Sequence, residues 1–563
     1  MMSDQDSIQQ TEGSGKQLVK DIAPACQLPD EILSHIFLLA MYSIDISHSR
    51  QLSCTYTVRL IYRRLYAFLG VCSSWRRVVL SSSSLWTLVP VLEQPNNQWG
   101  SLAAQQSLER AVGHRLRLVA YPSNTQPGIE DFIVQTLSQH GHRFDTINIH
   151  SDSADSIRHS LASLIKVADG TYVSIKELSL CYSESIGDEI SRPHIGGGTP
   201  INFHASPPLP AGVESLIESV RVLRICGMSI VPEGLSFTML TEIRLQSLVL
   251  GPKSAFVELL EVLSSSSQLR TLELISILTI HSNWPRAPEK KFPISLPNLR
   301  DVYLEDLDLD TLEFVLQSIA PGSYTTTLNW TARSCQSVEA YSYTSTNIVF
   351  LEKLSRLKID VLLFRRELGE VSIHKDVYYL LQAMPNITTL CLDSFYVDSE
   401  VLDALVPNTE SGSEQESSSG HWQHNYKKQN TNPPGFAQLT NLYIFRSHCH
   451  DLNALRDLPK VLAHHRIQEL GIGIGPDCDC KDHHAYAYPD EPESPGWGPR
   501  TLMYRSPPPE FIAPPTYDQE TIDSEIEHAW GSLEGSAPRL VRFTGASSDR
   551  PPVFGFASHI WQL

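Results

Sequence analysis

The chain has 563 residues, which is more than one ordinary hydrophobic core accommodates and enough for several domains or one elongated repeat array. Its formal net charge is −19, from 44 Lys and Arg against 63 Asp and Glu. Because an acidic chain repels phosphate backbones and anionic lipid, general binding to nucleic acid or to a membrane surface is disfavoured.

The N-terminus and the cysteines bear on the compartment. The first residues, MMSDQDSIQQ, lack the cationic start and apolar core of a signal peptide. The sequence contains no run of about 18 apolar residues that would predict a membrane-spanning helix. The ten cysteines are scattered along the chain instead of forming a dense disulfide framework. Reduced thiols are therefore expected, in the cytoplasm, the nucleus or both.

A helix is predicted to follow a polar, disordered tail at residues 1–27. Pro29 presets a helical φ angle, and Asp30 and Glu31 place negative charge at the positive end of the helix dipole. Apolar residues then recur at helical spacing, at Ile32, Leu33, Ile36, Phe37, Ala40 and Met41. They predict a short helix with one broad apolar stripe.

A second apolar stretch with helical spacing ends at the serine run that begins with Ser81, and Leu85-Trp86 then adds another apolar anchor. The members of this stretch are Val58, Tyr62, Leu65, Leu69, Cys72, Trp75 and Val79. Two or three short helices make a weak independent core, so the surplus of apolar residues predicts a docking surface. The alternative is that the stripe is the core of a helical cap on the segment that follows.

The order of these residues resembles the F-box-like domain abundant in mushroom-forming fungi. The motif Leu-Pro-x-Glu-Ile-Leu-x-x-Ile-Phe spans 28–37, Val-Cys-x-x-Trp-Arg spans 71–76, and Leu-Trp spans 85–86. Two features differ from the family pattern: Ser73-Ser74 replaces a basic residue, and residues 43–57 look like an insertion. In the family this three-helix unit binds the Skp-type adaptor of a cullin ubiquitin ligase. The resemblance implies adaptor-binding residues at Leu28, Pro29, Ile32, Leu33, Ile36, Val71, Cys72 and Trp75.

The rest of the chain repeats a short pattern: an apolar residue, two others, an apolar residue, one other, an apolar residue. Each occurrence predicts a short strand, and several are followed by a helical stretch, as in leucine-rich repeats. The occurrences begin at Phe144, Ile175, Val220, Leu240, Leu269, Leu299, Leu354, Ile387, Leu439 and Ile467. Helical stretches are predicted at 256–263, 312–319 and 378–384. The long gap from Leu299 to Leu354 requires an insertion or a missed repeat.

The predicted fold class is therefore α/β: an N-terminal three-helix F-box-like module followed by an irregular leucine-rich-repeat-like α/β solenoid. The module covers residues 28–90 and the array residues 91–475, with disordered inserts near 192–212 and 408–435. A proline-rich excursion is expected at 476–517 and a C-terminal cap at 518–563, because an end repeat cannot bury its open face alone.

Two segments superficially suggest a bound metal or phosphate. Cys478, Cys480, His483 and His484 offer four zinc-type ligands within a very short segment, but no second knuckle follows, and an ordinary loop is the default interpretation. The glycine-rich residues 471–475 lack the spacing and the following helix of a phosphate-binding loop, and an alternating strand explains them better. No catalytic, metal or cofactor-binding residue is therefore predicted.

The sequence predicts a non-enzymatic substrate-recognition subunit of a Skp–cullin–F-box ubiquitin ligase. The helices would bind the adaptor and, through it, a cullin scaffold, and the repeats would bind a protein substrate whose identity the sequence does not reveal. The alternative is an interaction scaffold without coupling to a ligase. An enzyme on a repeat platform would instead require a cleft that gathers His, Cys and carboxylate side chains with shifted pKa values.

Overall fold

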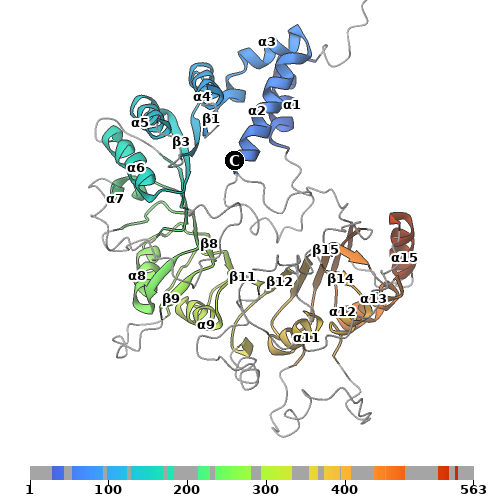
Figure 1. Cartoon of the computed structure of the whole chain (residues 1–563). Helices are drawn as coiled ribbons and strands as arrows, with labels where there is room; N and C mark the ends of the chain where they lie inside the picture. Colours follow the sequence, from blue (N-terminus) through green and yellow to red (C-terminus); the bar gives the residue numbers. More distant parts are fainter. Residues whose placement is uncertain are drawn as a thin grey trace, which may run out of the picture.

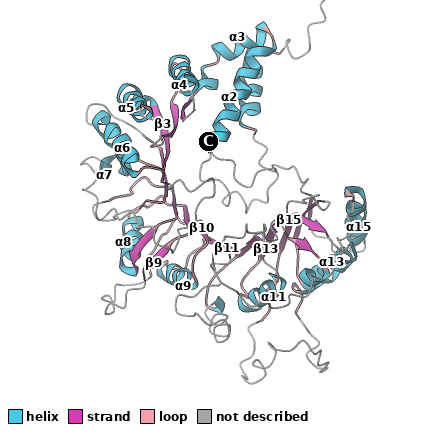
Figure 2. Ribbon diagram, viewed as in Figure 1, coloured by secondary structure: helices cyan, strands magenta, loops and turns pink. Residues whose placement is uncertain are grey.

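The computed structural model has an α/β fold built around one long parallel sheet (Figure 1). The sheet is curved: its helices lie on the outer side, and its strands form the inner side of the curve (Figure 2). The structure describes residues 28–43, 54–92, 98–122, 128–168, 175–182, 213–228, 235–280, 293–331, 354–365, 373–393, 395–407, 435–449, 452–475, 518–531 and 539–542.

Within this described part, the strands of the main sheet follow one another in chain order, and every neighbouring pair is parallel. The strands are β1 (Leu88–Leu92), β2 (Leu116–Tyr121), β3 (Phe144–Ser151), β4 (Glu177–Tyr182), β5 (Val222–Cys226), β6 (Glu242–Gln246), β8 (Thr271–Ile275), β10 (Asp301–Glu305), β11 (Thr325–Trp330), β12 (Val361–Arg365), β13 (Thr389–Asp393), β15 (Asn441–Cys449), β16 (Glu469–Gly475) and β17 (Arg539–Arg542). In addition, β14 (Tyr396–Val397) pairs with β15, and β7 (Val249–Pro252) pairs with β9 (Leu278–Ile280) in a separate small sheet.

Three helices precede the sheet: α1 (Asp30–Tyr42), α2 (Cys54–Val71) and α3 (Ser73–Ser81). A short 3₁₀ turn, η2 (Ser83–Trp86), joins them to β1, and a second, η3 (Gly141–Arg143), precedes β3. The helices between strands are α4 (Gln98–Arg110), α5 (Ile129–His140), α6 (Ala154–Ala168), α7 (Val213–Glu218), α8 (Lys253–Ser264), α9 (Leu309–Ser318), α11 (Ile373–Ala383), α12 (Ser399–Asp403), α13 (Leu452–His464) and α15 (Gln519–Gly531).

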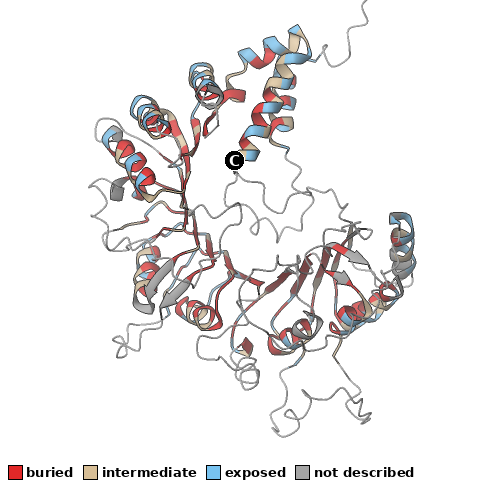
Figure 3. Ribbon diagram, in the orientation of Figure 1, coloured by how far each residue is buried: buried red, intermediate tan, exposed pale blue. Residues whose placement is uncertain are grey.

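The core lies between the sheet and the outer helices, where one apolar row crosses the main sheet from β1 to β17. The row is continuous because each member is the register partner of the next. Its members are Val91, Ala120, Ile149, Leu180, Ile225, Leu245, Leu274, Leu304, Leu328, Leu362, Leu390, Leu442, Leu470 and Leu540. All except the last are buried, and buried residues run along the sheet and the sheet-facing sides of the outer helices (Figure 3). Each strand therefore completes its core only against its neighbours.

Four consecutive strands of the main sheet are each followed directly by a residue with positive φ. These residues are Gly227, Ser247, Ser276 and Asp306, which directly follow β5, β6, β8 and β10. The backbone N–H of each of the first three donates a hydrogen bond to the next strand, as from Ser247 N to the carbonyl of Ile275 at 2.9 Å. Glycine and short polar residues adopt this left-handed conformation at the least steric cost. A turn of this kind recurs at equivalent places after successive strands and directs the chain away from the sheet.

Most of the predicted strands and helices are confirmed, but the stretch between β10 and β13 differs from the prediction. The Leu354 pattern does not form the strand expected there, because the Leu354–Leu357 segment forms the turn before β12. The same gap contains a strand that the pattern missed, β11, in which Thr326 occupies a core position beside Val302. The alternating strand expected at residues 471–475 is confirmed as part of β16.

Other predictions lie wholly or partly outside the described residues. These include the tail at 1–27, the insert at 192–212, almost all of the insert at 408–435, and the excursion at 476–517. Of the predicted cap, α15 and β17 are described, and β17 extends the sheet. The first strand, β1, begins inside the residues predicted for the helical module. None of the described helices is both long and apolar enough to cross a bilayer.

A substitution at Gly227 tests the turn after β5. At Gly227, φ is +69° and a Cβ atom would overlap the carbonyl oxygen of Tyr182, whereas Gly113 has φ +77° with open space around it. Gly113→Ala is expected to lower the free energy of unfolding by about 1–2 kcal/mol through backbone strain alone. Gly227→Ala is expected to lower the free energy of unfolding by at least about 2 kcal/mol more than Gly113→Ala does, because the overlap with Tyr182 adds to the backbone strain.

Urea unfolding of both variants and the wild type measures these differences. Equal losses of unfolding free energy in the two variants would show that the backbone near Tyr182 shifts easily to make room for a Cβ atom at position 227.

Candidate partner-binding surfaces

The three N-terminal helices are held together by polar contacts at the ends of α1. The guanidinium of Arg64 on α2 donates to the terminal carbonyls of α1, at 2.9 Å to Ala40 and 2.7 Å to Ser43. At the other end of α1, Arg77 of α3 forms an ion pair with Asp30 at 3.2 Å. Arg64 supplies a positive charge and N–H donors to carbonyls at the C-terminal end of α1, and Asp30 places negative charge at the positive, N-terminal end of its dipole. They fix α1 against α2 and α3.

An aromatic cluster forms the core of these helices. The ring centroid of Phe37 lies 4.7 Å from that of Phe68 and 4.8 Å from that of Trp75, so one residue of each helix meets in one contact. Leu33 and Met41 lie one turn on either side of Phe37 and are buried with it. Aromatic pairs at these separations contribute about 0.5–1.5 kcal/mol beyond their buried area. One side of α1 is therefore committed to the core.

Cys72 has a structural role at the junction of α2 and α3. It is the N-cap residue of α3, and its sulfur accepts a hydrogen bond from the backbone N–H of Trp75 at 3.4 Å. The sequence pattern predicted continuous helical spacing through this point, and the cap divides the segment into two helices. Immediately before the cap, Val71 ends α2 with its side chain exposed. The turn thus presents one apolar side chain while it directs Trp75 toward Phe37.

The other side of α1 carries an apolar stripe that no described residue covers. Ile32, Ile36 and Leu39 are spaced by three or four positions and lie on one side of the helix, and Leu28 is exposed just before its first residue. Ile32, Ile36 and Leu39 are 49%, 43% and 59% exposed. Of the ten large apolar side chains exposed in the described part of the chain, seven belong to residues 28–80. We call Leu28, Ile32, Ile36 and Leu39 the apolar stripe; single exposed apolar residues are ordinary, but a gathered set indicates a binding surface.

The sequence-predicted docking residues divide between surface and core. Leu28, Pro29, Ile32, Ile36 and Val71 are exposed, whereas Cys72 and Trp75 are half-buried. Leu33 is 2% exposed and packs in the core, so its side chain does not contribute to the surface. Leu39 was missing from the predicted set, although its spacing of seven from Ile32 is a signal that places it on the same side of the helix.

The helices are also fixed to the first strand of the sheet and to α4. The hydroxyl of Tyr62 donates to the carbonyl of Leu88 at 2.5 Å and lies 2.6 Å from the hydroxyl of Ser107, so α2, β1 and α4 meet at one buried group. Trp86 is buried beside them, and its indole N–H donates to the carbonyl of Val79 at 2.8 Å. The helices and the sheet therefore share one continuous core.

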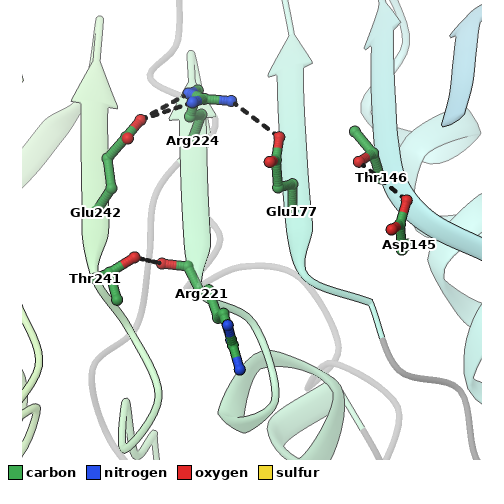
Figure 4. A network of polar contacts seen from close by, with 7 residues as sticks. All are labelled: Asp145, Thr146, Glu177, Arg221, Arg224, Thr241 and Glu242. Atoms are coloured by element: carbon green, nitrogen blue, oxygen red, sulfur yellow. Dashed lines mark hydrogen bonds and ion pairs between the residues drawn. The ribbon is translucent and has the colours of Figure 1, made fainter.

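The inner face of the sheet, opposite the helices, carries a charged network on β4, β5 and β6. The guanidinium of Arg224 lies between two carboxylates, 2.7 Å from Glu242 and 3.8 Å from Glu177 (Figure 4). Arg244, the register partner of Arg224 on β6, forms a second ion pair with Glu273 of β8 at 3.2 Å. This second pair is buried. Breaking one partner of a buried pair leaves an uncompensated charge, so the network constrains the sequence of this face.

Burial changes the protonation of Glu273. It raises the pKa of this carboxyl to about 7 because it disfavours the charged form, and Glu242 and Glu305 act in the same direction against the opposing influence of Arg244 and Arg224. Near neutral pH the carboxyl therefore exists in both protonation states. The charge of the inner face therefore changes with pH at this position.

The same face becomes apolar toward its C-terminal half. A separate buried cluster there consists of Ile275, Tyr303, Val361, Leu363, Cys391, Tyr443 and Phe445. These residues alternate along their strands with those that face the helices, so they project from the inner face. Because they are buried within the chain, they are not an open site for a partner in this structure.

Groups capable of catalysis or metal binding are sparse in the described part of the chain. No set of three or more His, Cys, Asp and Glu side chains there is arranged to hold a metal ion. Cys478, Cys480, His483 and His484 lie outside the described residues. His150, Cys181 and Cys226 occupy neighbouring register positions on β3, β4 and β5, and burial lowers the pKa of His150 to about 4. Its imidazole is thus neutral at physiological pH.

Comparison with known proteins gives no family assignment. No protein-family model matches the chain, and no curated protein matches it either.

The protonation of Glu273 predicts a pH dependence of stability. Because the folded-state pKa of about 7 lies above the ordinary value of 4.5, the folded chain binds the proton more tightly than the unfolded chain. The stabilisation is complete below pH 4.5 and is lost as the pH rises toward 7. The Gln side chain in Glu273→Gln cannot titrate. Relative to this variant, the wild type is expected to lose roughly 3 kcal/mol of unfolding free energy across this pH range.

Urea midpoints of the wild type and Glu273→Gln, measured from pH 4.5 to 8, test this expectation. A stability difference that is constant with pH, or that grows in favour of the wild type, would contradict it.

Proposed function

We propose that the chain is a substrate-recognition subunit of a Skp–cullin–F-box ubiquitin ligase. In this proposal α1, α2 and α3 form an F-box-like module that binds the Skp-type adaptor, and the long sheet with its outer helices is an irregular leucine-rich-repeat-like solenoid. The observation that carries the proposal is the apolar stripe, which lies where the F-box resemblance implies adaptor-binding residues.

The stripe supports binding of an apolar partner surface on energetic grounds. Its side chains are about half exposed, and burying the remainder of each is worth on the order of 1 kcal/mol. The stripe is held on a rigid support, because the opposite side of α1 packs through Leu33, Phe37 and Met41. A preformed helix loses little conformational freedom on binding, which favours affinity. In this proposal the chain contributes only proximity: the adaptor couples it to a ligase, and the chain holds a protein substrate near that ligase.

The repeat array has the role of holding a protein substrate. Supporting this role, its strands follow one another in chain order and give the chain a long curved surface. The substrate itself is a protein of unknown identity. The chain has no catalytic role in this proposal, and it is expected to work in the cytoplasm, the nucleus or both.

The second candidate is an interaction scaffold without ligase coupling, and the contacts of Tyr62 favour it. These contacts join the helices to β1, as expected of a cap that closes one end of a repeat array. A cap function accounts for the buried side of α1. It does not account for the exposed stripe on the other side, so we place it second.

The adaptor-binding proposal predicts the effect of charging the stripe. Ile32→Asp with Ile36→Asp is expected to weaken binding to a purified Skp-type adaptor from a mushroom-forming fungus by at least about 100-fold, or 2.8 kcal/mol, because two carboxylates would have to be desolvated at the interface. Isothermal titration calorimetry measures the affinity. Both positions are exposed, so the urea midpoint is expected to stay close to that of the wild type.

Leu102→Asp is the matched control, since Leu102 is comparably exposed but lies on α4, away from the stripe. It is expected to leave binding unchanged. Trp75→Ala is a poorer test because Trp75 packs against Phe37 in the core. If the wild-type chain does not bind the adaptor, the ligase proposal fails and the scaffold function is left.

A further inference from the structure

Two cysteines lie side by side on the inner face of the sheet. Cys181 on β4 and Cys226 on β5 are direct register partners, and both alternate with residues that face the helices, such as Leu180 and Ile225. Their side chains therefore project from the same face of adjacent strands. The cysteines are not joined by a disulfide, and they are 3% and 5% exposed. The proposed function does not use either thiol.

The spacing of the two strands suits a covalent bridge. Neighbouring strands lie about 4.7–4.9 Å apart, and disulfides join residues whose Cα atoms are about 4.4–6.8 Å apart. The two side chains also interact, since hydrogen bonding with Cys181 lowers the pKa of the Cys226 thiol. Directly after this pair, the absence of a side chain at Gly227 lets its backbone approach the carbonyl of Tyr182. The strands are thus held closely together at the cysteines.

The surroundings of Cys226 favour its reactive form. The hydrogen bond from Cys181 lowers the pKa of the Cys226 thiol, burial opposes this change, and Arg244 and Ser247 act with the hydrogen bond. The thiolate is the nucleophile in thiol oxidation, so Cys226 is the residue expected to attack first. The cationic group that supports it, Arg244, belongs to the charged network of the inner face.

We propose that Cys181 and Cys226 form an oxidation-sensitive dithiol that a small hydroperoxide converts into a disulfide between β4 and β5. The Cys226 thiolate attacks one peroxide oxygen, the O–O bond breaks, and Cys226 becomes a sulfenic acid while the other oxygen leaves as water or an alcohol after protonation. The sulfur of Cys181 then attacks the sulfenic sulfur, the S–O bond breaks, and a water molecule leaves with the thiol proton. Two electrons pass from the dithiol to the peroxide, and a dithiol reductant reverses the change.

The bridge has a defined structural consequence. The chain leaves the sheet after β4 and returns at β5, with α7 described in between. A disulfide from Cys181 to Cys226 would close this excursion covalently and fix the two strands in register. Oxidation is therefore expected to stabilise this part of the sheet against opening.

Cys391 provides a matched control on the same face. It is fully buried on β13, but its register partners are Leu363 and Tyr443, so no thiol stands opposite it on the adjacent strands. Burial raises the pKa of its thiol, and Asp393 acts in the same direction. Cys391 thus lacks both the neighbour and the electrostatic support that Cys226 has.

Peptide mapping of the reduced full-length chain after hydrogen peroxide treatment tests the proposal. The remaining thiols are alkylated, the chain is digested without reduction, and linked peptides are identified by mass spectrometry. The expected result is a linked pair of peptides containing Cys181 and Cys226, lighter by two hydrogen atoms than the separate peptides and lost after dithiothreitol. It is expected to be at least about tenfold more abundant than any link that includes Cys391, because a bridge requires closely placed Cα atoms.

Two variants separate the pair from general oxidation. Cys226→Ser is expected to abolish the linked form of Cys181, whereas Cys391→Ser is expected to leave the link between Cys181 and Cys226 unchanged. Oxidation of Cys226 to a sulfenic or sulfinic acid with no link to Cys181 would overturn the proposal. So would a link from Cys226 that forms equally well with cysteines elsewhere in the chain.

Discussion

The structure depends on one packing constraint: an apolar residue of each strand must meet its counterparts on the two neighbouring strands. The buried row from Val91 to Leu470 satisfies this requirement without interruption, although the elements between strands vary widely in length. A single strand with its helix has too little core to be stable, so stability comes from stacking. The same constraint explains why insertions occur between strands: an added segment there leaves the register of the row unchanged.

The N-terminal helices continue the apolar core beyond β1 and close that end of the sheet. Their aromatic core around Phe37 continues into the sheet through Tyr62, which bonds to the first strand and to α4. Because one side of α1 packs in this core, Ile32 and Ile36 on its other side lie at the surface. A helix that only capped the sheet would be expected to have polar residues there. The combination of a rigid inner side and an apolar outer side is what makes α1 a candidate for partner binding.

The inner face shows a different balance. There, Arg224, Arg244 and their carboxylate partners gather in the N-terminal half of the sheet, and apolar side chains such as Leu363 gather in the C-terminal half. The raised pKa of Glu273 shows that burial outweighs the attraction of Arg244 at that position. Close packing of charges and thiols on one face is therefore a source of pH and redox sensitivity that the apolar row on the other face does not have.

The sequence by itself determined the α/β class, most of the strands and the position of α1, because apolar periodicity is a local property of the chain. It failed at β11, where Thr326 occupies a core position, and before β12, where Leu354 and Leu357 form a turn. Only the tertiary structure decided which side of α1 is covered, so that Leu33 became core and Leu39 became surface. It also decided that Cys181 and Cys226 are neighbours. Spacing along the chain sets which side of an element a residue occupies, but pairing between distant segments sets what that side meets.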